Sequence, residues 1–179
     1  MPHIDLDTSI PGIRSLVMFR PETGKPLYEL VQVLLRGYST LPASDRELIA
    51  AYVSQKNDCR FCRDSHAAAA RVLSARPSLT DTALNDPTHP SVSRKMQALL
   101  RIAGKVQESG MDVTANDIVQ AKAASATDRE IHDTVLIAAT FSLFNRYVDG
   151  LATFTPTDPQ VYTEMGERMA KGYVLPQKK

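Results

Sequence analysis

The sequence has no long apolar run, no block of like charge and only two cysteines. Its longest apolar stretches, such as 135–139, are far too short to span a bilayer. The 21 basic and 20 acidic residues are interspersed and leave a net charge of +1, which gives no electrostatic footprint for nucleic acid or an anionic membrane. The N-terminus lacks the basic-then-apolar pattern of a signal peptide. We therefore expect a cytoplasmic protein whose partner is a small molecule or another protein.

Helical periodicity is present along most of the chain. A length of 179 residues with 43% hydrophobic content is enough for one domain with a sizeable core and no disulfide staples. No alternating pattern typical of a β-strand is present, so the predicted fold is an all-α, single-domain helical bundle over residues 1–179. We expect residues 1–12 to form an N-terminal arm, 13–151 the helical core, and 152–179 a C-terminal extension with a short helix.

Several helix starts are predicted from capping patterns, in which a side-chain oxygen accepts from a free backbone amide. Two capping boxes pair Ser44 with Glu47 and Thr127 with Glu130, and the other expected start residues are Pro26, Asp58, Ser93 and Thr114. Between Pro77 and Pro90, three prolines and several turn-forming residues predict the longest loop, which we interpret as a plain surface loop rather than a lid.

The two cysteines lie in the stretch 57–66, which ends in a histidine. At about 100° per residue along a helix, Cys59 and Cys62 lie about 60° apart and His66 falls between them. In a reducing compartment, a single Cys-x-x-Cys pair is more typical of catalysis or metal binding than of a structural disulfide. The spacing therefore brings two thiols and an imidazole to one face of a helix.

These residues suit a thiol peroxidase, which needs a thiolate nucleophile and a second thiol to resolve the resulting sulfenic acid. The helix N-terminus and His66 would both lower a thiol pKa. We assign Cys62 as the thiol that reacts with peroxide, because it sits beside His66, and Cys59 as the resolving thiol exposed to the reductant. The reverse assignment stays open because Cys59 has the better position on the helix dipole. Glu47, if its helix folds back, either orients His66 or serves only its capping box.

Glu47 followed by Cys59-x-x-Cys62-x-x-x-His66 resembles the alkylhydroperoxidase D-like branch of the carboxymuconolactone decarboxylase family, and particularly its peroxidase-related members. The resemblance runs from about residue 11 to 151. It implies an all-helical subunit that assembles as a trimer or hexamer, peroxidase activity from the cysteine pair, a proton relay through Glu47 and His66, and no cofactor. The expected partners are a hydroperoxide and an external dithiol reductant. One relay histidine of the pattern is replaced here by Phe61, and decarboxylase members lack the cysteine pair.

Three other functions fit parts of the pattern. A disulfide reductase would use the same thiols. A zinc site would use Cys59, Cys62 and His66, with a fourth ligand such as His3, His89 or His132, although no second ligand pair has suitable spacing. A non-catalytic helical assembly protein would simply bury its cysteines in a helix interface. Such thiols would react slowly and have ordinary pKa values.

The chain also contains a weak internal echo, because Ser44-Asp-Arg-Glu resembles Thr127-Asp-Arg-Glu. Carrying this alignment forward pairs Ser142 with Cys59, Asn145 with Cys62 and Asp149 with His66. An internal two-fold pseudo-repeat is one explanation, and chance recurrence of a capping box is the other. The remaining polar residues are interpreted as packing or solvated side chains: Tyr52, Arg60, Arg63, His132, Asn145 and Tyr147.

Overall fold

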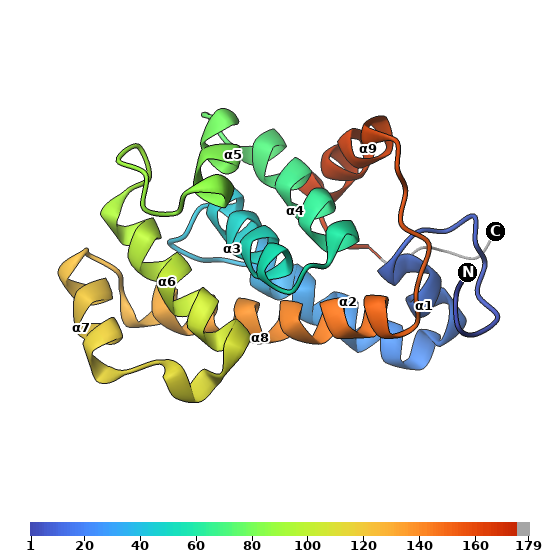
Figure 1. Ribbon diagram of the computed structural model, residues 1–179, viewed down its shortest axis with the longest axis horizontal. Helices are drawn as coiled ribbons and strands as arrows, with labels where there is room; N and C mark the ends of the chain where they lie inside the picture. The colour runs from blue at the N-terminus through green and yellow to red at the C-terminus, as the bar shows by residue number, and fades with distance from the viewer. Residues whose placement is uncertain (175–179) are drawn as a thin grey trace.

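A computed structural model describes residues 1–174, and within them the chain forms nine α-helices and one short 3-10 helix, with no β-strand (Figure 1). The prediction of an all-α fold is confirmed. In chain order the helices are α1 Ile13–Phe19, α2 Pro21–Arg36, α3 Ala43–Lys56, α4 Arg60–Leu73, α5 Ser78–Asn85, α6 Arg94–Glu108, η1 Gly110–Asp112, α7 Ala115–Ala123, α8 Asp128–Gly150 and α9 Pro159–Ala170. None of these helices is long and apolar enough to cross a membrane.

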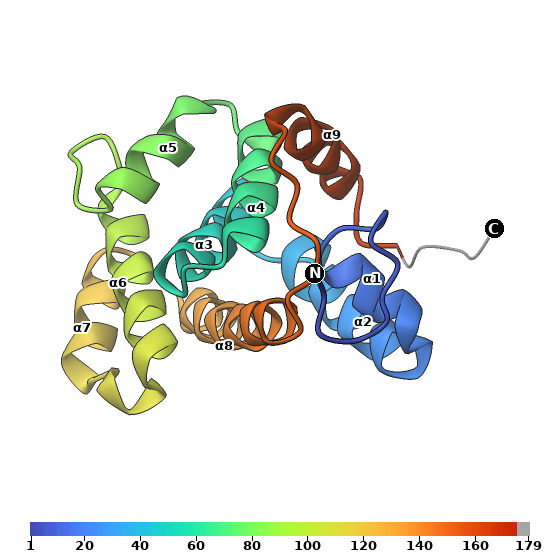
Figure 2. The ribbon, with the colours of Figure 1, turned by 45° about the vertical axis from the view of Figure 1, so that its right-hand side comes forward.

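Helix α3 lies at the centre of the fold, between α4, α6 and α8 (Figures 1 and 2). Its residues 49–51 and Val53 have no exposed surface, so α3 is buried on several sides rather than on one stripe. A connection of residues 57–59 joins α3 to α4, which packs directly against it. The long helix α8 supports this pair from below in the view of Figure 1. The helix that carries Cys62, with Cys59 at its N-cap, therefore packs on a largely buried helix.

Helices α4 and α9 approach closely through small side chains (Figure 2). The alanine run 67–70 of α4 is buried, and Gly166 of α9 lies against it. A Cβ atom added to Gly166 would lie 2.8 Å from the backbone carbon of Ala68, well inside van der Waals contact. The small side chains of the alanine run and Gly166 therefore permit the close approach of the two helices.

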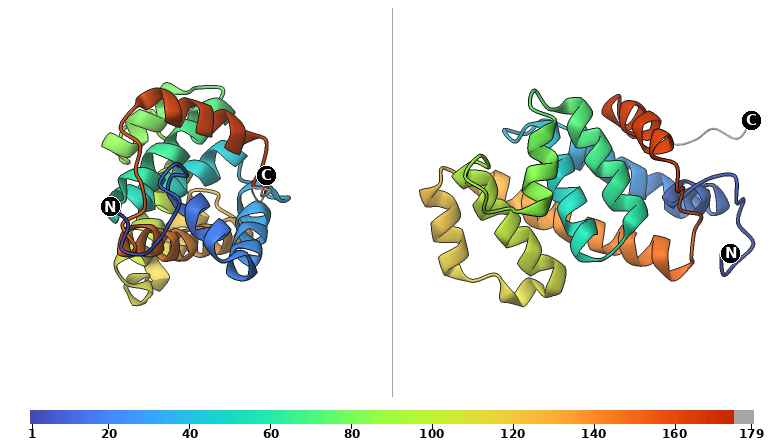
Figure 3. Two further views of the ribbon diagram at one scale, coloured as in Figure 1. Left: turned by 90° about the vertical axis from the view of Figure 1, so that its right-hand side faces the viewer. Right: turned by 45° about the horizontal axis from the view of Figure 1, so that its top comes forward.

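The N-terminal residues run along the segment that joins α8 to α9 (Figure 3). The backbone amide of His3 donates to the Leu151 carbonyl at 3.0 Å, and that of Gly12 donates to the Phe154 carbonyl at 3.0 Å. Leu6 is buried between these two points. The N-terminal residues and the α8–α9 connection therefore hold each other in place.

Three of the predicted helix starts are confirmed by their hydrogen bonds. The hydroxyl of Ser93 accepts from the amide of Met96, and full capping boxes form at Thr114 with Asp117 and at Thr127 with Glu130. These signals succeed because the capping side chain and its amide lie within one turn of each other.

Two other predicted caps, at Ser44 and Asp58, are wrong. Helix α3 begins at Ala43 with Pro42 at its N-cap, so Ser44 lies inside the helix and Glu47 turns into the core instead of reaching back. Asp58 has a left-handed backbone with φ 56°, and α4 begins two residues later with Cys59 at the N-cap. The chain reverses at Asp58, so this residue cannot hold the extended conformation that an N-cap adopts.

Two proline-based predictions also fail. Pro26 was expected in the first turn of its helix, but α2 already begins at Pro21, which occupies the tolerated first position and leaves Pro26 inside the helix. The predicted loop between Pro77 and Pro90 contains helix α5, which buries Thr80, Ala83 and Leu84 on one face. This 3- and 4-residue spacing is helical, and the surrounding turn-forming residues obscured it.

Candidate active site

The two cysteines lie at the start of α4, both reduced and both buried. Cys59 has no exposed surface and Cys62 is 3% exposed. The prediction that Cys59 faces the solvent is therefore wrong. The reversal of the chain at Asp58 turns Cys59 towards α8, where its thiol donates a hydrogen bond to Oδ1 of Asp149 at 3.4 Å.

The pKa of the Cys62 thiol is raised well above its ordinary value, contrary to the lowering predicted from the helix dipole. The largest cause is a hydrogen bond with Cys59, because a thiol that donates to a neighbouring sulfur is stabilised in its protonated form. Burial and the charge of Cys59 also raise the pKa of Cys62, whereas a hydrogen bond with Asn145 lowers it. Cys62 is therefore protonated at rest.

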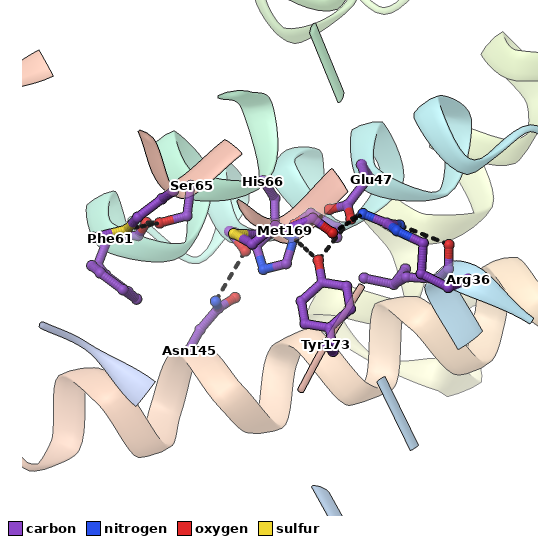
Figure 4. Close-up of polar contacts among 12 residues, drawn as sticks. Arg36, Glu47, Phe61, Ser65, His66, Asn145, Met169 and Tyr173 are labelled. Carbon is purple, nitrogen blue, oxygen red and sulfur yellow. Dashed lines mark hydrogen bonds and ion pairs between the residues drawn. The ribbon is translucent and has the colours of Figure 1, made fainter. Parts of the chain in front are cut away.

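The buried carboxylate of Glu47 contacts three polar side chains, those of His66, Arg36 and Tyr173 (Figure 4). Its Oε2 atom lies 2.6 Å from Nδ1 of His66. Its Oε1 atom accepts from Nη2 of Arg36 at 2.6 Å and from the hydroxyl of Tyr173 at 2.6 Å. Nη2 of Arg36 also donates to the carbonyl of Met169 at 2.8 Å, which ties the network to the end of α9.

This network sets the protonation of its members. Burial alone raises the pKa of Glu47, but the charge and hydrogen bond of His66, followed by Arg36 and Tyr173, outweigh burial and lower it. The pKa of Tyr173 is raised well above its ordinary value by burial and by the Glu47 charge. Glu47 is therefore an ionised carboxylate at neutral pH, and Tyr173 remains a hydrogen-bond donor to it.

The ring of His66 is fixed in orientation by its neighbours. The edge of the ring meets Phe141 of α8 at a centroid distance of 4.4 Å, and Tyr173 lies nearly parallel at 6.3 Å. Because Nδ1 faces the Glu47 carboxylate, the tautomer with its proton on Nδ1 is favoured, and the lone pair of Nε2 is then left free. His66 is arranged as a base whose second nitrogen is held by a carboxylate.

Amide and hydroxyl side chains hold the connection before Cys59 against α8. Nδ2 of Asn57 donates to Oδ1 of Asn145 at 2.8 Å and lies 3.4 Å from the Ser142 hydroxyl. Nδ2 of Asn145 donates to the Ser54 hydroxyl at 3.0 Å. Asn145, expected only to pack, thus lies beside Cys62, and Asp149 beside Cys59. The residues singled out by the internal echo do line the cysteine segment, whereas the pseudo-repeat itself stays a prediction.

A pocket of about 250 Å³ reaches Cys62 and His66 from the surface. Its inner wall is mainly apolar and comes from α1, α2, α8 and α9: Ile13, Val31, Phe141, Phe144, Met165 and Met169. The volume is just below the range of roughly 300–1,000 Å³ that is usual for drug-sized ligands. Cys62 lines this pocket and Cys59 does not, so a small molecule in the pocket meets Cys62.

Phe61, at the position where a relay histidine was expected, forms part of the pocket wall. It is 5% exposed and packs near Tyr162, with ring centroids 6.4 Å apart. Gly12 lies against its ring, since a Cβ atom at Gly12 would come within 1.9 Å of Cε1. The backbone φ of 57° at Gly12 also favours glycine. Phe61 is thus a packing residue that contacts the N-terminal arm.

The arginines beside the cysteines form ion pairs, and the described residues contain no cluster that fits the alternative zinc site. Arg60 and Arg63 pair with Asp64 at 3.5 and 2.8 Å, as expected for solvated side chains. Within residues 1–174, no three histidine, cysteine, aspartate or glutamate side chains form a cluster able to hold a metal ion.

The sequence prediction missed Arg36 and Tyr173. These two residues bind Glu47 from 11 residues before it and 126 residues after it. No local motif marks either position, because contacts over such separations depend on how the helices pack.

Comparisons with known proteins show a family similarity over part of the chain and a similar fold. Residues 21–103 match the model of the carboxymuconolactone decarboxylase family. An uncharacterized peroxidase-related protein from Silicibacter sp. TM1040 has a similar structure, with a TM-score of 0.76 and 25% sequence identity over 86% of this chain and 79% of that chain. No curated protein matches the chain significantly.

A second solved structure, the alkylhydroperoxidase AhpD core of an uncharacterized peroxidase-related protein from Ralstonia eutropha JMP134, shares the fold. Its TM-score is 0.77, with 22% identity over 88% of this chain and 81% of that chain. The matched segment contains both cysteines, Glu47 and His66, and the similarity of fold extends over most of the described chain. Residues 21–103 are therefore similar to the carboxymuconolactone decarboxylase family, and the chain shares the fold of two peroxidase-related proteins, one of them an alkylhydroperoxidase AhpD core.

Proposed function

We propose that the protein is a thiol-dependent peroxidase that reduces hydroperoxides through Cys62 and Cys59. The family that residues 21–103 resemble and the names of the structural neighbours suggest a peroxidase-like function in general terms. The observation that carries the finer proposal is that Cys62 and His66 share one pocket, with the Glu47 carboxylate directly behind the histidine. This arrangement supplies a nucleophile, a base and a group that orients the base.

The reaction begins with removal of the Cys62 proton. Because the pKa of this thiol is raised, few molecules contain the thiolate at neutral pH, and the nucleophile must be generated when the peroxide is present. The free Nε2 atom of His66 takes the proton while Nδ1 donates to Glu47. The cation formed on His66 is stabilised by the Glu47 carboxylate.

Peroxide reduction and disulfide formation then follow, and neither step needs a cofactor. The Cys62 thiolate attacks one peroxide oxygen, the O–O bond breaks, and the alkoxide takes a proton from His66 to leave as an alcohol. Cys62 is then a sulfenic acid. The Cys59 sulfur attacks the Cys62 sulfur, which forms the disulfide and releases water. Asp149, at 3.4 Å from Cys59, is placed to accept the Cys59 proton.

An external dithiol then reduces the disulfide and is itself oxidised. Since Cys59 is fully buried and Cys62 lines the pocket, the reductant attacks the Cys62 sulfur from the pocket side and Cys59 leaves as the thiol. This route replaces the earlier expectation that the reductant meets an exposed Cys59. It favours a small or slender dithiol over a broad protein surface.

The burial of Cys62 is also what the non-catalytic assembly protein would show, but its raised pKa differs both from the ordinary value expected for that protein and from the lowered value expected for the enzyme. The open pocket at Cys62 and the hydrogen-bonded base inside it favour the enzyme over the non-catalytic assembly protein. Packing alone gives no reason for a polar network with a buried carboxylate behind the thiol.

The test is to mix the reduced protein with hydrogen peroxide, an organic hydroperoxide or buffer, and to follow the Cys59–Cys62 disulfide by mass spectrometry. We expect both peroxides to form the disulfide, and Cys59→Ser to stop at a trapped sulfenic acid on Cys62. Cys62→Ser should form neither product. Thiols that stay as reduced as in buffer would overturn the peroxidase proposal. Reduction of added small disulfides under the same conditions would then point to the disulfide reductase.

A further inference from the structure

The mouth of the Cys62 pocket contains a group of basic and phenolic side chains that the reaction above does not use. Arg14 of α1, Tyr28 of α2 and Arg168 of α9 all line the pocket. Arg168 is exposed, Arg14 and Tyr28 are half-buried, and Cys62 and His66 are buried. The pocket therefore leads from a basic surface, past an apolar wall, to the reactive sulfur.

These three side chains have no acidic partner among residues 1–174. Neither arginine takes part in an ion pair there, and none of the three side chains donates a hydrogen bond to another protein group in that part of the chain. Most other arginines near this site are paired, as Arg36 is with Glu47 and Arg63 with Asp64. Three residues that line the pocket, two arginines and a tyrosine, thus have no partner for their polar groups among residues 1–174.

The two arginines are also close enough to repel one another. Burial, followed by the charge of Arg14, lowers the pKa of Arg168. Burial raises the pKa of Tyr28, against the charges of the same two arginines. A partly desolvated pair of like charges is unfavourable by itself, and an anion bound between them would relieve the repulsion.

We propose that the preferred substrate is an organic hydroperoxide with a carboxylate group at the end of an apolar body. The carboxylate binds Arg14 and Arg168 at the mouth, the apolar body lies along Phe141, Met165 and Met169, and the hydroperoxide reaches Cys62. Guanidinium groups bind carboxylates with two parallel hydrogen bonds, so they fix orientation as well as affinity. This inference rests on the proposed peroxidase function, and it adds the class of substrate.

The experiment compares a medium-chain fatty acid hydroperoxide with its methyl ester, which differs mainly in the missing charge. We expect the wild-type protein to prefer the acid by about tenfold or more in kcat/KM for Cys62 oxidation, since charged hydrogen bonds are the stronger ones. In the Arg14→Gln/Arg168→Gln double variant, this preference should fall at least several-fold, and Lys171, which also lines the pocket, accounts for any preference that remains. Arg94→Gln, an exposed arginine at the start of α6, serves as the matched control and should keep the preference.

A second measurement does not depend on turnover. Octanoate and methyl octanoate are added to the reduced protein, and protection of Cys62 from iodoacetamide is followed by mass spectrometry. Octanoate should protect Cys62 at lower concentration than the ester in the wild type, and this difference should shrink at least several-fold in the double variant. Equal protection in the wild type, or equal kcat/KM for acid and ester, would overturn the carboxylate proposal and leave the peroxidase standing. Protection by octanoate without any oxidation by peroxides would support the carboxylate site and overturn the peroxidase proposal.

Discussion

Oε2 of Glu47 faces Nδ1 of His66 at 2.6 Å, and no other side chain within residues 1–174 donates to that oxygen. The other carboxylate oxygen is shared by Arg36 and Tyr173. Oε1 is therefore held by Arg36 and Tyr173, and Oε2 contacts only His66 among the described side chains. These contacts fix the direction in which His66 presents its free nitrogen.

Glu47→Gln should lower the free energy of unfolding by about 3 kcal/mol or more, because Arg36 is left largely buried without its counter-charge. The folded pKa of Glu47 is lowered, so its stabilising effect is complete above the unfolded value of about 4.3 and is lost as the pH falls through the folded value. The difference between wild type and variant, measured by urea unfolding, should therefore shrink below about pH 4.3.

Ser44→Ala is the matched control for this substitution. If the carboxylate of Glu47 served a capping box, both variants would lose stability to a similar extent. Because no cap hydrogen bond forms at the start of α3, we expect Ser44→Ala to change the unfolding free energy by less than about 0.5 kcal/mol. A loss of about 1 kcal/mol would contradict the position of Glu47 given above.

His66→Gln should slow oxidation of Cys62 by peroxide by about 10²- to 10⁴-fold at neutral pH, because the raised thiol pKa leaves little thiolate without a base. The residual rate should rise about tenfold per pH unit as the thiol ionises unaided. Stopped-flow measurement across pH gives both quantities. His132→Gln, at an exposed histidine of α8 whose side chain is 70% exposed, should match the wild type. A variant rate independent of pH would contradict the role of His66 as base.

Cys59→Ala should lower the pKa of Cys62, since the hydrogen bond with Cys59 is the largest cause of its elevation. The pH dependence of Cys62 alkylation by iodoacetamide measures this directly, and its midpoint should move to lower pH. Circular dichroism checks that the variant is folded. An unchanged or higher midpoint would mean that burial rather than the neighbouring sulfur controls the thiol.

Tyr173→Phe removes one hydrogen bond to the Glu47 carboxylate and keeps the ring beside His66. Hydrogen bonds to charged groups contribute about 1.5–3 kcal/mol, so the unfolding free energy should fall by that amount and the rate of Cys62 oxidation should fall with it. Tyr38→Phe, at a residue that is 82% exposed, is the control. Equal stability of the two variants would show that Arg36 alone holds Glu47.

Local chemistry explains which parts of the fold could be predicted. The starts of α6, α7 and α8 depend on side chains that bind amides within one turn, and the sequence contains all the information needed. The caps at Ser44 and Asp58 failed because packing competed for the same residues. Burial of Glu47 against His66, and a left-handed backbone at Asp58, are consequences of the α3–α4 contact, which no local pattern contains.

The candidate site likewise contains residues that local spacing predicts and residues whose positions depend on helix packing. Cys59, Cys62 and His66 were predicted as a group because helical spacing alone places them together, whereas the exposure of Cys59 depends on α8 and was predicted wrongly. Arg36 and Tyr173 could not be predicted, since they reach Glu47 only after α2 and the end of α9 have packed. The trimer or hexamer implied by the family resemblance stays a prediction.

The proposed reacting groups of the pocket and much of its wall come from different stretches of the chain. The reacting groups, Glu47 to His66, lie inside the segment 21–103 that matches the family model, whereas Phe141, Arg168 and much of the remaining wall lie beyond it. Substitutions of Met165 or Arg168 in the later stretch would therefore change the pocket wall and leave the proposed nucleophile and base in place, whereas substitutions of Phe141 or Tyr173 would also disturb the contacts of His66 and Glu47. A protein built in this way can acquire a new substrate while its chemistry is inherited unchanged.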